Sequence, residues 1–293
     1  MNKEECVTIP ENAEPSVNNA ALTVYRLMGR PNSQDMSLGL IFLHGTNDRV
    51  RNLESEAQYM VVAGMALFVV ATEGGNEVHE LLAGQSVKIL AGQWYQDIGH
   101  AAMVSLNHEA FNPETVEYDK IFEPVLSGEK VTIQKFSMSD ATDIFGLIDR
   151  NRDHLSQYEE ETAIKYPTLR SVVESLANPK PRRRRYAIRN GDGMYVGTIN
   201  MQTHQNNSHI AEIGYYLGSE FQGNGYMVDA ARTLTDHAFR DLDVHLMYGL
   251  VHPDNIGSQR VLERSGYTYT RKQQVEHDGH FVSCLRYEKR RSI

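Results

Sequence analysis

A glycine-rich turn, Gln222-Gly223-Asn224-Gly225-Tyr226-Met227, carries the clearest chemical signal in this chain. A strand-like run at residues 212–217 precedes it, and apolar residues at helical spacing follow it from Met227 to Phe239. Free backbone N–H groups at such a helix start form an anion site, and glycines let a pyrophosphate approach the backbone closely. A hairpin at Asn224-Gly225 is the competing interpretation, but a hairpin would continue into a strand of period two. The turn therefore predicts a phosphate-binding site.

The segment from Asn255 to Tyr267, NIGSQRVLERSGY, carries the second signal. Asn255 has the side chain of a helix N-cap, and Gly266 is the residue type that ends a helix in a left-handed conformation. Ser258 falls in the first turn of the helix between them. The segment lies about 30 residues after the glycine-rich turn and predicts a short helix followed by a strand.

Together the two segments resemble motif A and the later Asn-x-x-Ser and Glu-Arg-x-Gly-Tyr motifs of the GCN5-related N-acetyltransferases, the GNAT family. The family signature Gln/Arg-x-x-Gly-x-Gly/Ala is matched by Gln222 and Gly225, while Met227 departs from its last position. A methionine there is familiar in the branch that resembles Rim-type ribosomal-protein N-acetyltransferases. The resemblance runs from Val131 to about Tyr287 and implies a mixed central sheet flanked by helices.

The resemblance also implies transfer of an acetyl group from acetyl-CoA, as cosubstrate, to a primary amine. It assigns Gln222, Gly223, Asn224, Gly225, Tyr226 and Met227 to the CoA pyrophosphate and Asn255 to the pantetheine arm. Direct attack needs a base and an acid, for which Glu212 and Ser258 are the candidates. Leu262 stands where many relatives have a tyrosine that protonates the thiolate. The alternatives are a strand-edge carboxylate for Glu212 and a first-turn hydrogen bonder for Ser258.

The elements that would position these residues alternate between strands and helices, so we expect an α+β domain over residues 127–293. Ser137 to Asp140 predicts a capping box after a first strand, and an apolar stripe at Ile144 to Ile148 predicts a helix. The further expected elements are a helix at Ala163–Leu176 and strands at Tyr186–Arg189, Met194–Gln202 and Ile210–Leu217.

Four adjacent arginines, Arg182 to Arg185, form the strongest charge run in the chain. They could grip phosphates or an acidic partner, but a solvated loop is the favoured interpretation. The run is too short to indicate a nucleic-acid-binding protein.

The first half predicts an all-β unit over residues 20–125, after a tail at residues 1–19. Short runs rich in branched and aromatic residues alternate with turn signals, which is typical of a sandwich or barrel. The expected strands are Ala21–Met28, Ser37–His44, Gln58–Ala63, Met65–Thr72, Glu77–Leu82, Ser86–Leu90 and Ala101–Asn107. Residues 58–111 resemble the cupin family of small jelly rolls, with a fainter likeness to cupins that isomerise nucleotide-linked keto sugars.

Most cupin enzymes hold a metal through histidines and a glutamate. The matching positions here hold Arg51, Leu53, Ala57 and Tyr95, and the first three cannot serve as its ligands. We therefore expect no metal and a barrel mouth lined by Arg51, Tyr59, Trp94 and Tyr95 that binds a small ligand, or a unit that mediates dimerisation. An anionic ligand would need Arg49 and Arg51 to point into the cavity.

Composition bounds the remaining possibilities. With 41 % hydrophobic and 23 % charged residues the chain is globular, and its 293 residues suggest two domains. Residues 1–126 hold 7 Lys+Arg against 17 Asp+Glu, a charge of −10, whereas the rest hold 22 against 21, a charge of +1. The net charge of −9 for the whole chain argues against nucleic acid as a partner. Two cysteines, Cys6 and Cys284, and no long apolar run favour a cytoplasmic protein without a membrane span.

Three functions fit these observations. The preferred one is a Rim-like acetyltransferase for a protein N-terminus or a small amine, with an accessory first domain. The second is an acetyltransferase for a nucleotide-linked amino sugar. The third is a non-catalytic acyl-CoA-binding sensor.

Overall fold

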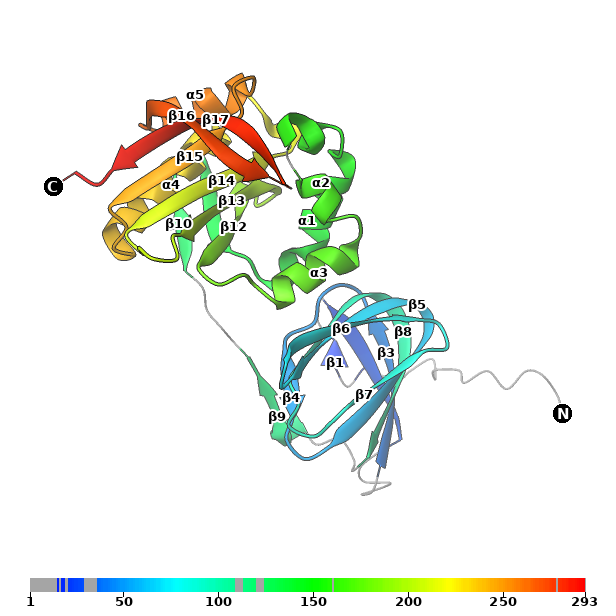
Figure 1. Ribbon diagram of the computed structural model, residues 1–293. Helices are drawn as coiled ribbons and strands as arrows, with labels where there is room; N and C mark the ends of the chain where they lie inside the picture. Colours follow the sequence, from blue (N-terminus) through cyan, green and yellow to red (C-terminus); the bar gives the residue numbers. More distant parts are fainter. Residues whose placement is uncertain are drawn as a thin grey trace. The chain divides into compact units, whose positions relative to one another are not determined.

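The computed structural model describes residues 15, 17–18, 21–28, 36–108, 113–119, 124–159, 161–277 and 279–292 (Figure 1). The chain divides into two compact units, Met1–Ile121 and Phe122–Ile293, each with its own sheet. Most of the tail expected at residues 1–19, with Cys6, lies outside the described residues. None of the helices within these ranges combines the length and apolarity that crossing a bilayer requires.

The first unit forms a nine-stranded antiparallel sheet, and the described part of the unit is all-β apart from one 3-10 turn, as the sequence predicts. The order is β1-β2-β3-β8-β4-β9, while β5 pairs with β6, β7 and β8. The strands curl round an apolar core that includes Leu43, Val61, Phe68 and Met103 (Figure 1). Its elements are β1 Val17–Asn18, β2 Leu22–Met28, β3 Met36–Leu43, β4 Val50–Asn52, β5 Glu56–Thr72, β6 Gly75–Leu82, β7 Ser86–Ile89, β8 Tyr95–His108, the 3-10 turn Pro113–Thr115 and β9 Val116–Tyr118.

The two strands expected at Gln58–Ala63 and Met65–Thr72 are one strand, β5. Gly64 lies inside it at φ +82°, next to a register shift against β8. A Cβ at this position would clash with the carbonyl oxygen of His100 on β8, so only glycine fits. The glycine therefore marks a bulge within a strand rather than the end of one.

The aromatic residues expected at the barrel mouth split into two groups. Tyr59 and Tyr95 join their hydroxyls over 2.7 Å, and both rings lie against the buried ring of Phe68. Burial raises the pKa of Tyr59 to about 12. This tyrosine pair thus belongs to the edge of the core.

Trp94 instead carries two arginines on its ring. The guanidinium carbons of Arg51 and Arg49 lie 4.8 and 5.6 Å from its ring centroid. Arg51 also pairs with Glu117 over 2.6 Å, and Arg49 pairs with Asp119 over 3.1 Å. Both cations are therefore already matched by carboxylates, which lowers their value for an anionic ligand.

Asp97 on β8 makes the stability of the first unit depend on pH. It is 4 % exposed and accepts from Asn47 Nδ2 over 3.1 Å, and burial raises its pKa to about 6 from 3.8. Because the folded state then holds this proton more tightly than the unfolded state, stability is gained as the pH falls through 6. We expect the unit to be more stable at pH 5 than at pH 8 by about 1 kcal/mol.

Chemical denaturation of the full chain at the two pH values measures this difference. Asp97→Asn should lose the difference in unfolding free energy between pH 5 and pH 8, because the asparagine amide does not titrate in this range. An equal pH dependence in the wild type and the variant would contradict the assignment.

The second unit holds an eight-stranded mixed sheet in the order β10-β11-β12-β13-β14-β15-β17-β16. Only the β14–β15 pair is parallel among these described neighbours. The strands are β10 Val125–Ser127, β11 Val131–Lys135, β12 Arg183–Asn190, β13 Tyr195–Thr203, β14 Ile210–Leu217, β15 Leu246–Val251, β16 Thr268–His277 and β17 His280–Arg290. The helices are α1 Ala141–Arg150, α2 Thr162–Lys165, α3 Leu169–Ala177, α4 Tyr226–Asp241 and α5 Ile256–Arg264, with 3-10 turns at Met138–Asp140, His154–Glu159 and Ser219–Phe221.

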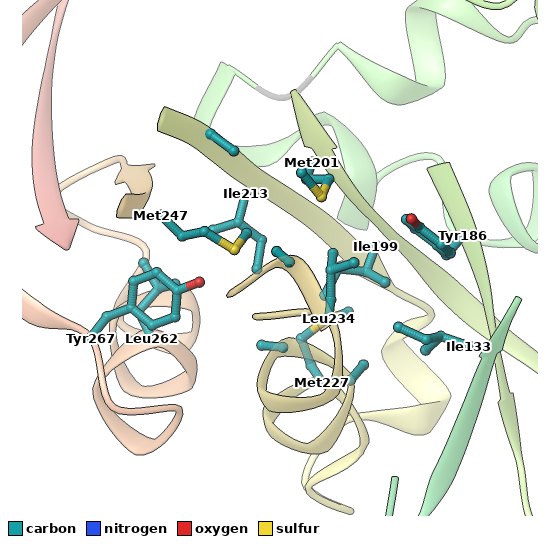
Figure 2. Packing of buried hydrophobic residues seen from close by; sticks show 14 of the residues in the cluster. Ile133, Tyr186, Ile199, Met201, Ile213, Met227, Leu234, Met247, Leu262 and Tyr267 are labelled. Atoms are coloured by element: carbon teal, nitrogen blue, oxygen red, sulfur yellow. The ribbon is translucent and has the colours of Figure 1, made fainter. Parts of the chain in front are cut away.

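Alternation along the strands gives this sheet one apolar face and one polar face. On the apolar side, Met227 and Leu234 of α4 and Leu262 of α5 pack against strand residues such as Ile199 and Ile213 (Figure 2). The other face carries polar side chains of β12, β13 and β14, and residues of α1, α2 and α3 line a cavity above it. The apolar face thus holds the domain together and leaves the polar face for chemistry.

The helix expected at Ala163–Leu176 is two helices, α2 and α3. Pro167 separates them, because a residue before proline is disfavoured in the helical region and Tyr166 has φ −122° and ψ 65°. Thr168 then caps α3 by accepting from Ser171 N over 3.2 Å.

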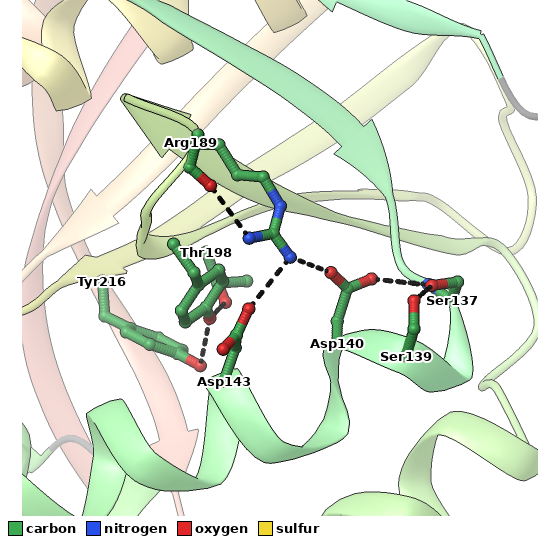
Figure 3. A network of polar contacts seen from close by, with 9 residues as sticks. Ser137, Ser139, Asp140, Asp143, Arg189, Thr198 and Tyr216 are labelled. Carbon is green, nitrogen blue, oxygen red and sulfur yellow. Dashed lines mark hydrogen bonds and ion pairs between the residues drawn. The ribbon is translucent and has the colours of Figure 1, made fainter. Parts of the chain in front are cut away.

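Arg189 of β12 fixes the start of α1 over the polar face (Figure 3). Its Nη2 donates to Asp140 over 2.6 Å and to Asp143 over 3.0 Å. Asp140 in turn accepts from Ser137 N over 2.8 Å, which completes the predicted capping box. These contacts anchor α1 beside the cavity.

Candidate active site

Strands β14 and β15 separate after their first three residues. Their parallel register runs from Ile210↔Leu246 to Glu212↔Tyr248, while β14 stays paired with β13 as far as Leu217. Two cavities, of about 530 and 560 Å³, reach this point and share Glu212, Gly214, Tyr215 and Tyr216 as lining residues. We call the first the helix-side cavity, because α1–α3 line it, and the second the turn-side cavity, because the glycine-rich turn and α5 line it.

The glycine-rich turn lies against the turn-side cavity. Gly223 and Gly225 have φ of +80° and +79°, and α4 begins directly after Gly225, so the hairpin interpretation is excluded. A Cβ at Gly223 would meet open space, so the φ value and not crowding favours glycine there. The first N–H groups of α4 have no partner within the helix and sit at the positive end of its dipole.

A lysine beside the turn adds a full positive charge. Lys130 Nζ donates to the carbonyl oxygen of Asn224 over 3.0 Å. Its backbone is held in place by Asp229 in the first turn of α4, which accepts from Lys130 N over 2.7 Å and from Glu129 N and Val131 N. The turn thus combines backbone donors with an ammonium group, an arrangement suited to a pyrophosphate.

The start of α5 lines the same cavity. Asn255 caps the helix by accepting from Ser258 N over 3.0 Å, and Gly266 has φ +89° after its end, as the sequence predicts. Tyr215 of β14 donates to the carbonyl oxygen of Ser258 over 3.1 Å. Ser258 is half-buried and lines the turn-side cavity.

Glu212 is the first member of a hydrogen-bonded chain that crosses from one cavity to solvent. Tyr248 Oη donates to Glu212 Oε2 over 2.9 Å, and His204 Nε2 lies 2.8 Å from the same hydroxyl. Burial, together with the charge of Glu212, raises the pKa of Tyr248, so its hydroxyl stays protonated. Because that proton is donated to Glu212, His204 Nε2 must carry the proton of the second hydrogen bond.

Arg286 stacks against the ring of Tyr248 and so supports the hydrogen bonds between Glu212, Tyr248 and His204. Its guanidinium carbon lies 3.7 Å from the ring centroid, and its Nε donates to Glu288 over 2.7 Å. Arg286 is 7 % exposed, so the ring rests on a fixed and charge-balanced support. The tyrosine hydroxyl is thereby held at one position relative to Glu212.

The arginine run is not a solvated loop, and that interpretation is wrong for Arg183, Arg184 and Arg185. They form the start of β12, paired through Arg183↔Gln202 and Arg185↔Asn200 with β13, because strand pairing overrides the weak strand preference of arginine. Arg183 and Arg185 line the helix-side cavity, whereas Arg184 is exposed on the other side of the strand.

The structure brings most of the predicted site residues together. The turn-side cavity is lined by Glu212, Gln222, Gly223, Gly225, Met227, Asn255 and Ser258. Asn224 is exposed and donates from its side chain to the carbonyl oxygens of Phe221 and Gln222 within the turn, while Tyr226 packs against the core. The roles given to these residues stay predictions, while Lys130, His204 and Tyr248 are additions that sequence reasoning missed.

Comparison with known proteins agrees with this geometry. Residues 130–268 match the family model described as the acetyltransferase (GNAT) domain. The Bacillus subtilis protein named "Probable N-acetyltransferase YjcK" is 29 % identical over 150 residues, covering 49 % of this chain and 83 % of its own. From the same organism, "Putative ribosomal N-acetyltransferase YdaF" is 28 % identical over 169 residues, covering 55 % and 88 %.

The fold of the second unit also has a counterpart among crystal structures. One described as a probable acetyltransferase is similar with a TM-score of 0.51 and 22 % identity, covering 58 % of this chain and 98 % of that one. Residues 130–268 are therefore a GNAT acetyltransferase domain, and the α+β fold class expected from the sequence is confirmed.

Proposed function

We propose that this chain, with its GNAT domain at residues 130–268, moves the acetyl group of acetyl-CoA to a primary amine by direct attack. The observation that carries the proposal is the meeting of two cavities at Glu212, with Ser258 lining the turn-side cavity. A donor and an acceptor that enter from opposite sides can react only where both cavities open.

The turn-side cavity fits acetyl-CoA. Gly223, Gly225 and the N–H groups of the first turn of α4 would hold the pyrophosphate, with Lys130 beside it. Beyond Glu212, β14 is paired with β13 on one edge but no longer with β15 on the other. The backbone groups on that open edge could hydrogen-bond the pantetheine amides, as if the arm were an added strand. Asn255, which lines the same wall, would face the arm near its thioester end.

Glu212 is the proposed base. An ammonium group must lose a proton before its nitrogen attacks the thioester carbon, and the carboxylate of Glu212 lines both cavities. Once His204 holds its ring proton on Nδ1 instead of Nε2, both hydrogen bonds can reverse. Glu212 then returns its proton to the Tyr248 hydroxyl, which gives its own proton to Nε2 of the exposed His204, and His204 releases a proton to solvent. The raised pKa of Tyr248 keeps its hydroxyl protonated, so the hydroxyl has to pass one proton on as it receives another.

Ser258 is the proposed acid. As the C–N bond forms, the C–S bond breaks and the leaving sulfur takes up a proton, which the Ser258 hydroxyl can give. The Asn255 cap and the bond from Tyr215 fix the backbone of Ser258 on both sides.

Acetyl-CoA turnover by the full chain against peptides, polyamines and amino sugars tests the proposal, with CoA release and acetylated product measured together. Peptide or small-amine acetylation supports the preferred reading, and acetylation of nucleotide-linked amino sugars supports the second. Acetyl-CoA binding without hydrolysis or acetylation of any acceptor would contradict both and support a sensor.

Ser258→Ala should lower kcat about 10- to 100-fold while the Kd of acetyl-CoA changes little. The effect is moderate because a thiol with a pKa of about 8.5 leaves readily even as a thiolate. Steady-state kinetics and calorimetry check the two quantities, and Ser258→Thr is the control because it keeps the hydroxyl. A kcat for Ser258→Ala close to that of the wild type would remove Ser258 from the mechanism.

A further inference from the structure

The helix-side cavity has a charge distribution that the transfer reaction does not require. Arg183, Arg185 and Lys165 line it on the side of α2 and β12. Glu212 supplies the one carboxylate among its described lining residues, and it lies on β14. Lys165 is neutralised by Glu161 through an ion pair one helical turn away. Two guanidinium groups are left to define this part of the cavity.

Neither guanidinium has a carboxylate partner in the described part of the chain. Arg183 Nε donates to Asn200 Oδ1 over 3.3 Å. Arg185 donates from Nη1 to Ser175 Oγ over 2.8 Å and from Nη2 to the Ser175 carbonyl oxygen over 2.5 Å, and is half-buried. Neutral acceptors orient these groups but leave their charge unbalanced, and a partly desolvated cation is costly without an anion.

The register of the sheet sets the distance from these arginines to the base. Arg183 pairs with Gln202, Gln202 with Glu212 and Glu212 with Tyr248, so four adjacent strands carry them in one row. Residues in such a row point to the same face, and two strand spacings put the Cα atoms of Arg183 and Glu212 about 10 Å apart. A ligand of modest size can therefore reach both.

We propose that the acceptor amine carries an anionic group, a carboxylate or a phosphate, that Arg183 and Arg185 bind while Glu212 receives the amine. This inference rests on the proposed function and adds the chemical class of its acceptor. The arrangement suits recognition by charge at both ends, because the guanidinium forks bind the oxygens of the anion and the carboxylate attracts the ammonium. The glycine-rich turn on the turn-side cavity, with Lys130 bonded to its Asn224 carbonyl oxygen, remains available for the phosphates of acetyl-CoA.

Matched acceptor pairs test the inference in the full chain. The pairs are Ser-Asp-Ala-amide with Ser-Asn-Ala-amide, 4-aminobutyrate with 4-aminobutyramide, and glucosamine 6-phosphate with glucosamine. We expect at least a tenfold higher kcat/KM for the anionic member of at least one pair. The pair that shows it tells whether the anion is a carboxylate or a phosphate.

Arg183→Gln should reduce that preference at least tenfold, and Arg183→Lys should retain part of it. Arg184→Gln is the matched control, because the neighbouring side chain is exposed outside the cavity and should leave the ratio unchanged. Acetyl-CoA affinity measured by calorimetry shows that each variant is folded.

The outcomes separate this inference from the function on which it rests. Equal kcat/KM within every acetylated pair, or a preference that survives Arg183→Gln, overturns the anionic acceptor and leaves the transferase. Binding of acetyl-CoA with no amine of the panel acetylated overturns the proposed function for these amines, and the anionic acceptor falls with it.

Discussion

Glu212→Gln should lower kcat by about 10²- to 10⁴-fold while the Kd of acetyl-CoA stays near that of the wild type. Glutamine keeps the size of the side chain and can still accept the 2.9 Å hydrogen bond from Tyr248. It cannot take the proton of an incoming ammonium group, so the loss falls on the chemical step. Steady-state kinetics with the best acceptor, together with calorimetry for acetyl-CoA, measures the two effects.

The pH profile distinguishes a base from a merely structural carboxylate. In Glu212→Gln the fraction of free amine should limit the rate, so kcat/KM should climb about tenfold per pH unit until the amine pKa is reached. Tyr248→Phe is the companion variant, since it removes the relay to His204 but leaves the carboxylate. A Glu212→Gln profile parallel to that of the wild type would contradict the base assignment.

Local sequence was sufficient for those parts of the site that a few neighbouring residues determine. The turn from Gln222 to Met227 needs glycines at positive φ followed by an amphipathic helix, and the sequence shows both the glycines and the helical spacing of apolar residues. The Asn255 cap and the Gly266 end of α5 are local in the same sense. The strand at Ile210–Leu217 was predictable to its bounds because its pattern is interrupted cleanly at both ends.

Contacts between distant residues were not accessible in this way. Tyr248 meets Glu212 across 36 positions and Lys130 meets Asn224 across 94, and no local pattern encodes either contact. Arg183 and Arg185 were expected in a solvated loop, because a run of charged residues is usually solvated. Here the run pairs with β13, so alternate side chains point toward the helix-side cavity. Gly64 was expected to end a strand, because a β-bulge and a turn both require a residue that tolerates positive φ, and the sequence alone does not distinguish them.

Gly225→Asp should weaken acetyl-CoA binding about 100-fold, which corresponds to about 2.7 kcal/mol. The new carboxylate would lie at the start of α4 where the pyrophosphate is proposed to bind, and two like charges at about 4 Å in a partly solvated site repel by about 1–4 kcal/mol. It would also lie close to Lys130 Nζ, which is 3.3 Å from a Cβ at this position, and so would draw this lysine away from the pyrophosphate. Calorimetry with the full chain measures the change in Kd.

Gly225→Asn separates this charge effect from the strain at φ +79°. Asparagine and aspartate have almost the same shape, and both tolerate the left-handed region better than other side chains. The asparagine variant should therefore bind acetyl-CoA at least tenfold more tightly than the aspartate variant, with both as stable to denaturation as each other. Equal losses in the two variants would mean that backbone strain, and not a phosphate next to Gly225, governs binding, and the pyrophosphate would then have to lie elsewhere in the turn-side cavity.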